Sequence, residues 1–347
     1  MKRKSGPDRI FEMASFWPTR VLQTGVLMGV FDALAGGPRT AAQLARRLGA
    51  KARSLELLLN ALVGLDLLVK RGETYANTRE AVRFLVTSSE ECVAANVAHG
   101  AYMWDSWGRL EESVRTNAPA RHERWRYRAP DQLRAFILAM HSGGRAKGER
   151  IARALDLEGR THLADIGGGP GTYAIMFCRH YPGLRATVVD RAEVLPIARE
   201  VVARHGLEDR FGFVACDVVA EPRIPTRYDV AWVSNLVHSY DERTNLAMLR
   251  KVVRALEPGG VLYLQDFLLD ETRAKPLWPA VFALNMLVHT DGGRTYTEGE
   301  VKDWFKRLGL RKVRRLKIAL ANGAGIIAGW KPVGAGWKPV KAGRRPA

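Results

Sequence analysis

The chain has 347 residues, of which 47% are hydrophobic and 26% are charged. This length and this apolar share are sufficient for two domains, each with its own core. No uninterrupted apolar stretch reaches the roughly 18 residues that suggest a membrane span, and Asp8 and Glu12 interrupt any apolar signal-peptide segment. The three cysteines, Cys92, Cys178 and Cys216, lack the spacing of a metal or redox motif. We therefore expect a metal-free protein of the reducing cytoplasm.

The formal net charge of the chain is +18. Basic residues cluster at 121–134, 311–317 and 341–345. Such an excess of positive charge is compatible with an anionic partner, which would be a nucleic acid, a membrane surface or an acidic substrate. The simpler interpretation, which we favour, is a solvated surface rich in arginine.

The first quarter of the chain has the pattern of several amphipathic helices. An apolar stripe near helical period runs from Val21 to Leu34. Thr40 is expected to cap a helix over residues 41–48, and Ser54 is expected to cap a helix over residues 55–65. The stretch therefore predicts a helical domain.

A hairpin is predicted directly after these helices, because the apolar residues 67–69 and 75–77 flank the polar turn 70–73. Three helices and a wing are the layout of a winged helix. A DNA-reading helix needs polar and basic side chains that reach base edges, whereas the third helix, over 54–69, is dominated by leucine and has no lysine or arginine. We therefore predict a dimerisation module, and nucleic acid is an unlikely partner.

A glycine cluster, Gly167-Gly168-Gly169-Pro170-Gly171, follows an acid, Asp165. Residues 162–164 are expected to end a buried strand, and residues 173–181 are expected to form a helix. Glycine lets the backbone turn sharply and approach a ligand that a Cβ would repel. A turn of this kind, at the carboxyl end of a parallel strand, is the usual ligand crevice of an open α/β sheet.

Two cofactor classes compete for this turn, beside a tight turn that binds no ligand. Residues 169–174 match the dinucleotide fingerprint with alanine in third place. The frame Asp165-x-Gly167-x-Gly169-x-Gly171 instead resembles the first motif of S-adenosylmethionine-dependent methyltransferases. S-adenosylmethionine has an amino-acid end and a ribose but no phosphate, so an acid close to the glycines suits it.

Four further predicted strands end in polar residues. Asp190 ends the second strand and can accept both hydroxyls of a ribose, and Asp217 ends the third, where it suits the amine of adenine, with Val218 against the ring. Residues 227–235 and 256–266 give a fourth and a fifth strand. The predicted cofactor-binding residues are Asp165, Gly167, Gly169, Asp190, Asp217, Val218 and Ser234.

The order of these motifs, with helices between them, resembles the class I methyltransferase fold over roughly residues 150–330. We thus predict an α/β protein, with a Rossmann-like sheet and an N-terminal, mainly helical winged-helix dimerisation domain. The predicted limits are a flexible N-terminus (1–9), the dimerisation domain (10–95), a helical linker and substrate-pocket segment (96–150), the catalytic domain (151–332) and a flexible basic tail (333–347). The tail includes the second copy of a repeat, 329–335 and 336–342, and only the first copy is expected to finish the last strand.

Nearly all of residues 10–330 resembles the O-methyltransferases of the caffeic acid and acetylserotonin type, whose bacterial relatives act on polyketides, carotenoids and bacteriochlorophyll precursors. Two sequence segments are typical of that family's dimerisation domain: Gly29-Val30-Phe31-Asp32-Ala33-Leu34 and Thr40-Ala41-Ala42-Gln43-Leu44-Ala45. The resemblance implies a homodimer that uses S-adenosyl-L-methionine, releases S-adenosyl-L-homocysteine and methylates a small-molecule acceptor.

The resemblance also implies a catalytic histidine, His238, which lies just beyond the fourth strand. A phenol has a pKa near 10, so a positioned base assists its methylation at neutral pH. Plant relatives orient the histidine with two acids. Asp266 matches the first, but Thr295 stands where the second is expected, so activation rests on Asp266 alone.

Position against the family pattern also indicates an acceptor pocket with aromatic and methionine side chains, which suit a flat, conjugated molecule. Its predicted residues are Phe136, Met140, His141, Phe282, Met286 and His289. Two alternatives to O-methylation stay open. One is carbon methylation of a tetrapyrrole or similar ring, since Thr295 replaces an acid, and the other is a non-catalytic winged-helix regulator that binds DNA and senses a ligand.

Overall fold

The computed structural model describes residues 6–120 and 130–334. The chain divides at Trp104 into two compact units, which we describe separately. Most of the basic cluster at 121–134 and the whole second copy of the C-terminal repeat lie outside the described residues. Among the described residues, no helix combines the length and the apolar character that a membrane span requires.

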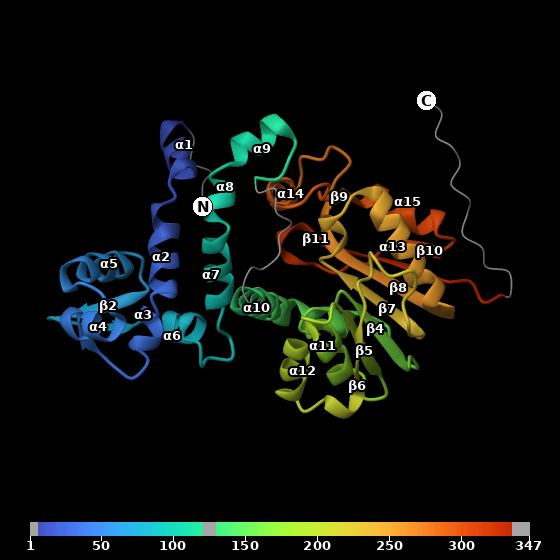
Figure 1. Cartoon of the computed structure of the whole chain (residues 1–347), viewed down its shortest axis with the longest axis horizontal. Helices are drawn as coiled ribbons and strands as arrows, with labels where there is room; N and C mark the ends of the chain where they lie inside the picture. The colour runs from blue at the N-terminus through green and yellow to red at the C-terminus, as the bar shows by residue number, and fades with distance from the viewer. Residues whose placement is uncertain (1–5, 121–129, 335–347) are drawn as a thin grey trace. The chain divides into compact units, whose positions relative to one another are not determined.

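The first unit consists of short helices and a small three-stranded sheet (Figure 1). Its elements are α1 (Pro7–Ala14), α2 (Trp17–Leu27), α3 (Val30–Ala33), β1 (Arg39–Thr40), α4 (Ala41–Leu48), α5 (Ala52–Gly64), β2 (Leu68–Arg71), β3 (Thr74–Asn77), α6 (Arg79–Leu85) and α7 (Ala94–Tyr102). Strands β2 and β3 form an antiparallel hairpin, which confirms the predicted wing. The N-terminus is expected to be flexible over residues 1–9, but α1 begins at Pro7, within this segment. The predicted domain limits stay predictions.

The apolar stripe from Val21 to Leu34 predicts a single helix, and this prediction is wrong because the structure has two helices there. Gly29 separates α2 from α3 and has a φ of +73°, in the left-handed region that favours glycine. Val30, Phe31 and Ala33 of α3 are buried, so the apolar stripe continues across the break although the helix does not.

Of the two predicted helix caps, one is correct. Thr40 caps α4 in a reciprocal capping box, in which its hydroxyl accepts the Gln43 N–H at 3.2 Å and the Gln43 side chain accepts the Thr40 N–H at 2.8 Å. The Ser54 cap is wrong, because α5 begins earlier, at Ala52, and the Ser54 hydroxyl donates to the Lys51 carbonyl. The third helix therefore includes Arg53, contrary to the expectation that it has no basic residue.

The second unit is built on an eight-stranded sheet of order β10-β11-β8-β7-β4-β5-β6, with β9 paired to β8. Its strands are β4 (His162–Ile166), β5 (Arg185–Asp190), β6 (Phe211–Ala215), β7 (Tyr228–Ser234), β8 (Leu256–Leu269), β9 (Tyr296–Thr297), β10 (Arg311–Arg315) and β11 (Ala324–Trp330). The neighbours from β6 to β8 pair in parallel, and β11 pairs antiparallel with β8 and with β10. The carboxyl ends of β4, β5, β7 and β8 therefore meet at one edge, where ligands bind in such sheets.

Helices α10 (Pro130–Ala154), α11 (Thr172–His180) and α12 (Leu195–Ala203) cover one face of the sheet, and α13 (Glu242–Ala255) and α15 (Glu298–Arg307) cover the other. The remaining helices are α8 (Trp104–Trp107, at the division), α9 (Leu110–Thr116) and α14 (Leu277–His289), with single turns η1 (Glu208–Arg210), η2 (Val237–Ser239) and η3 (Ala321–Gly323). Figure 1 shows α11 and α12 beside β4 to β6, and α13 and α15 beside β7 to β11.

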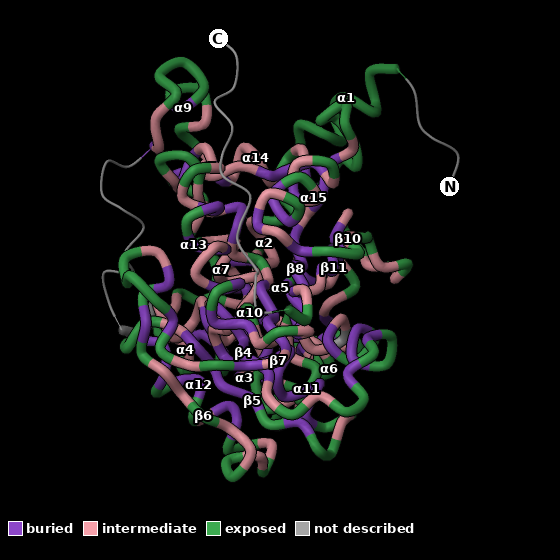
Figure 2. The backbone as a smooth tube through the Cα atoms, turned by 90° about the vertical axis from the view of Figure 1, so that its right-hand side faces the viewer, coloured by how far each residue is buried: buried purple, intermediate pink, exposed green. Residues whose placement is uncertain are grey.

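Strand residues alternate between two hydrophobic cores, as a sheet covered on both faces requires. Val230 and Trp232 of β7 belong to a core shared with α10, α11 and α12, and the intervening Ala231 and Val233 belong to a core shared with α13 and α15. Figure 2 shows the strands of this sheet largely in the buried colour. The two cores therefore fix the carboxyl ends of β4, β5, β7 and β8 relative to one another.

The first copy of the C-terminal repeat finishes the last strand, as expected. Trp330 ends β11 and packs its ring against Tyr263 of β8. The next residue, Lys331, is buried, and its ammonium group donates to the carbonyls of Val253 (2.9 Å), Arg254 (3.3 Å) and Leu256 (2.5 Å). It thereby satisfies carbonyls at the end of α13 that have no partner within the helix.

Candidate active site

The glycine turn joins the end of β4 to the start of α11. Gly167, Gly169 and Gly171 have φ values of +64°, +54° and +73°, which residues with a side chain rarely adopt. At Gly168, a Cβ would lie 2.7 Å from Cγ of Asp165, so the turn closes tightly over that carboxyl group. At Gly169, a Cβ would meet no atom within 4 Å, so one side of the turn is open.

Asp165 lies beneath this turn and is only 1% exposed. Burial, together with the charge of Asp190, raises the pKa of Asp165 to about 7, although the backbone amide of Ala174 opposes the shift. The side chain therefore lies against the turn. Its predicted contact with a cofactor stays a prediction.

Asp190, at the end of β5, is bonded to the same turn. Its Oδ2 accepts the Gly169 N–H at 2.7 Å, and its Oδ1 accepts the Arg191 N–H at 2.7 Å. Burial raises the pKa of the Asp190 carboxyl group, and the two amide donors oppose that shift. The structure therefore brings Asp165, Gly167, Gly169 and Asp190 together.

Asp217 lies just beyond β6 and is exposed. Its Oδ1 accepts the backbone N–H groups of Val219 (2.9 Å) and Ala220 (3.0 Å). With Arg191 and Cys216 it lines an open pocket of about 520 Å³. Val218 is buried in the core on the α13 side, and Ser234 is the half-buried last residue of β7.

His238 lies in η2, between β7 and α13. The Asn245 side chain of α13 donates to the carbonyls of Val237 (2.8 Å) and Tyr240 (3.1 Å), which fixes the loop that carries the histidine. Asp266 comes from the neighbouring strand, and the register of Ser234 with Gln265 places that strand beside the loop. Two elements that are far apart in the sequence thus meet at the sheet edge.

The His238 and Asp266 side chains form a buried pair. Nδ1 of His238 lies 2.7 Å from Oδ1 of Asp266, and the two residues are 8% and 2% exposed. The Phe267 N–H also donates to Oδ1 of Asp266, at 2.7 Å. A carboxylate on Nδ1 holds the imidazole in the tautomer whose Nε2 can accept a proton.

Thr295 does not replace the missing acid, because its hydroxyl donates to the Pro279 carbonyl of α14 at 3.0 Å. It is 2% exposed and therefore anchors α14. Gly293, two residues before Thr295, lies close to the backbone of the loop that carries His238. A Cβ there would lie 2.5 Å from the His238 carbonyl oxygen and 3.0 Å from the Ser239 carbonyl carbon.

The predicted acceptor residues lie on two helices. On α14, the Phe282 ring meets the His238 ring edge-on, with centroids 4.9 Å apart, and Met286 and His289 are nearly buried. On α10, Phe136 packs near Val194 and Ile197, Met140 is 36% exposed, and His141 Nδ1 lies 2.9 Å from the Thr172 hydroxyl. Phe282 therefore adjoins the histidine, whereas His141 adjoins the glycine turn.

Sequence reasoning missed Phe267, Asn245 and Gly293. The Phe267 ring stacks on His238, with centroids 6.3 Å apart, and lies 4.7 Å from the Phe282 ring. The only sequence feature that could have indicated Phe267 as a site residue is its position directly after Asp266. The contacts of Asn245 and Gly293 depend on how distant segments pack, which no local pattern encodes.

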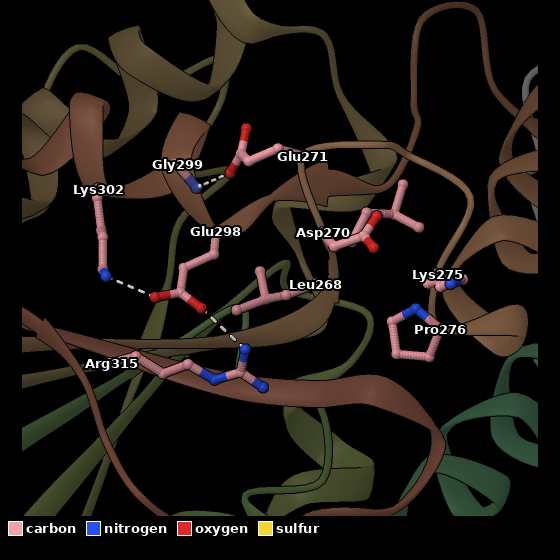
Figure 3. Close-up of a pocket in the computed structure, with 10 residues that line it drawn as sticks. Leu268, Asp270, Glu271, Lys275, Pro276, Glu298, Gly299, Lys302 and Arg315 are labelled. Carbon is pink, nitrogen blue, oxygen red and sulfur yellow. Dashed lines mark hydrogen bonds and ion pairs between the residues drawn. The ribbon is translucent and has the colours of Figure 1, made fainter.

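A second pocket, of about 540 Å³, lies at the carboxyl end of β8 beside α15 and β10 (Figure 3). Glu298 pairs there with Lys302 (2.5 Å) and Arg315 (2.9 Å), and Glu271 accepts the Gly299 N–H at 3.0 Å. These charges are engaged with one another, and none of the predicted site residues lines this pocket. In the part of the chain that the structure describes, no group of three or more His, Cys, Asp or Glu could hold a metal ion.

Comparison with known families adds to this geometry. A profile described as the O-methyltransferase domain matches residues 119–311, and one described as the O-methyltransferase dimerisation domain matches residues 12–87. The chain belongs to the O-methyltransferase family. The predicted resemblance, the fold class and the assignment as an S-adenosylmethionine-dependent enzyme are thereby confirmed.

Relatives match this O-methyltransferase along most of its length. The 3-hydroxy-5-methyl-1-naphthoate 3-O-methyltransferase of Streptomyces sahachiroi is 33% identical, over 94% of this chain and 95% of its own. The tetracenomycin polyketide synthesis 8-O-methyl transferase of Streptomyces glaucescens is 31% identical, over 90% and 94%. The structure of human N-acetylserotonin methyltransferase with S-adenosylmethionine superposes with a TM-score of 0.82 at 27% identity, over 95% of this chain and 100% of that one.

Proposed function

We propose that this O-methyltransferase transfers the methyl group of S-adenosyl-L-methionine to a hydroxyl group of a small aromatic or polyketide-like molecule, with His238 as the general base. The observation that carries the proposal is the 2.7 Å contact between His238 Nδ1 and Asp266 Oδ1 at the edge where the parallel strands end. It adjoins the aromatic ring of Phe282.

The residues at the glycine turn fit S-adenosylmethionine. The turn is open at Gly169, a half-buried acid ends β5, and a pocket of about 520 Å³ adjoins Asp217. In the proposed site the turn binds the amino-acid end, Asp190 accepts the ribose hydroxyls and Asp217 accepts the adenine amine. When bound, S-adenosylmethionine supplies an electrophilic methyl group on a sulfonium sulfur.

His238 removes the proton of the acceptor hydroxyl in this proposal. Nδ1 donates its hydrogen to Asp266, so Nε2 is left as the proton acceptor. As the proton arrives, the imidazole becomes a cation, which the Asp266 carboxylate stabilises, as in a catalytic triad. The rings of Phe267 and Phe282 exclude water beside the pair, and a drier site strengthens the electrostatic interaction.

The relatives support an aromatic acceptor, because two of them are named for methylation of a naphthoate and of a tetracenomycin polyketide. Phe267, Phe282 and Met286 provide a ring-rich, polarisable wall that suits a flat molecule. His289, beside Met286 on α14, would offer a polar contact. Its Nδ1 lies 2.8 Å from the Asn285 carbonyl oxygen.

Calorimetric titration with S-adenosylhomocysteine tests the cofactor site without knowledge of the acceptor. We expect the wild type to bind it and Asp190→Ala to bind about ten-fold or more weakly, because charged hydrogen bonds to the ribose are lost. Asp209→Ala, an exposed acid in the same unit, is the matched control. A folded wild type that does not bind S-adenosylhomocysteine would overturn the proposal.

A screen of phenolic, naphthoic and polyketide acceptors then tests the reaction. NMR of the product distinguishes a new O-methyl group from a new C-methyl group by the carbon chemical shift. An O-methyl product is the expected outcome. A C-methyl product would contradict the role of His238 as the base for a hydroxyl group.

A further inference from the structure

His141 of α10 contacts the residue that ends the glycine turn. Its Nδ1 lies 2.9 Å from Oγ1 of Thr172, which is the first residue of α11 and follows Gly171 directly. Thr172 is only 3% exposed, so water has little access to its hydroxyl group. The His141 side chain therefore bonds to the point where the turn becomes a helix.

Close packing between α10 and α11 fixes this contact. Gly144 and Gly148 follow His141 at spacings of three and seven, which place all three on one helix face. A Cβ on Gly144 would lie 3.2 Å from Cγ2 of Thr172, and a Cβ on Gly148 would lie 2.9 Å from Cγ of Met176. The absence of side chains at these positions lets the α10 backbone lie directly on the start of α11.

The surroundings of His141 keep its ring neutral. Burial, together with the positive charges of His205, Arg145 and Arg204, lowers the pKa of His141 to about 4. The His141 and His205 rings lie 5.9 Å apart. A neutral ring with one nitrogen on a buried hydroxyl is suited to hold a neighbour in place, and it is not suited to carry protons at neutral pH.

We propose that His141 is a positioning residue of the cofactor site, which acts through Thr172 to hold the glycine turn 167–171 in the geometry that binds S-adenosylmethionine. This inference rests on the proposed function. It gives His141 a different role from the acceptor contact that the sequence indicates. No direct contact between His141 and either substrate is involved.

Four variants test the inference by calorimetry with S-adenosylhomocysteine. We expect His141→Ala and Thr172→Val each to weaken binding about three- to ten-fold, since each removes the same half-buried hydrogen bond. The double variant should bind no more weakly than either single variant, because residues that act through one contact are not additive. His141→Asn, whose amide can take the place of Nδ1, should restore binding to within about two-fold.

Ser142→Ala is the matched control, because its hydroxyl bonds to the Leu138 carbonyl within α10. A His141→Ala protein that melts at a lower temperature but binds S-adenosylhomocysteine as the wild type does would show a merely structural role and overturn the inference. Additive losses in the double variant would overturn it as well. A wild type that does not bind at all would instead refute the proposed function.

Discussion

His238 and Asp266 are both almost fully buried, and the two carboxylate oxygens of Asp266 differ in their hydrogen bonds. Oδ1 of Asp266 is engaged by the histidine and by the Phe267 amide, whereas Oδ2 has no hydrogen-bond partner among the described residues. The carboxylate is thus held by one oxygen, and its orientation depends on the imidazole. Removal of either side chain leaves a buried polar group unpaired, which is costly.

We expect His238→Ala to lower kcat by about 10²- to 10⁴-fold, the usual contribution of a general base. Asp266→Asn should also lower kcat, because the amide can hold the imidazole in the wrong tautomer. Steady-state kinetics with an accepted phenol measures both effects, and the Kd for S-adenosylhomocysteine should stay within about two-fold. His180→Ala, an exposed histidine, is the control. Unchanged turnover in His238→Ala would refute its role as base.

Asp165 makes the free energy of unfolding depend on pH. Its pKa is raised from 3.8 to about 7 in the folded protein, so its favourable contribution is complete below about pH 4 and is lost as the pH rises toward 7. Asp165→Asn removes this titration. We expect the melting temperature of the variant, relative to that of the wild type, to be higher at pH 8 than at pH 5. An equal difference at both pH values would contradict a raised pKa.

At the scale of elements, the contact between residues 290–296 and η2 sets the position of His238. Gly293 lies against the carbonyl of His238, and Tyr296 donates its hydroxyl to the Tyr240 carbonyl at 2.5 Å. The loop is thus held by the segment before α15 on one side and by Asn245 of α13 on the other.

Gly293→Ala should displace this loop, because its Cβ would meet backbone atoms that cannot rotate away. We expect kcat/KM to fall at least ten-fold, since a small misplacement of a catalytic group is costly. Binding of S-adenosylhomocysteine should be unchanged. Gly183→Ala, where a Cβ meets nothing within 4 Å, is the control. Equal activities of the two variants would show that the close approach is not needed.

Much of this element structure follows from local sequence. The strands that end near Asp165, Asp190 and Asp266 are apolar runs bounded by polar residues, and local rules place them well. The break at Gly29 was hidden, because apolar residues continue at helical spacing on both sides of it. The hydrogen bonds from Thr295 to Pro279 and from Asn245 to Val237 span 16 and eight residues, so local patterns could not predict them.

At the scale of the whole molecule, the first unit exposes large apolar side chains. No residue of α1 is buried, and Phe11 and Trp17 are 71% and 73% exposed. Exposed apolar groups of this kind mark an interaction surface. The match to a dimerisation domain over residues 12–87, which includes Trp17, supports a second copy of the chain as the partner.

We therefore expect the wild type to elute as a dimer, with light scattering as the measure of mass. The double variant Phe11→Ser, Trp17→Ser should shift the population toward the monomer, because burial of two aromatic rings is lost. Arg47→Ser, an exposed polar position on α4, should leave the mass unchanged. A dimer that persists at low concentration in the double variant would place the interface elsewhere.

Strand β11 has a consequence for how the enzyme is made. It lies between β8 and β10, and it pairs Gly325 with Asp266, yet every residue proposed for catalysis or binding precedes it in the chain. A premature stop codon shortly before Ala324 would preserve all of those residues and still leave β8 as an open sheet edge, prone to aggregation. On the ribosome, likewise, the strand that carries Asp266 lacks one of its neighbours until β11 has been synthesised.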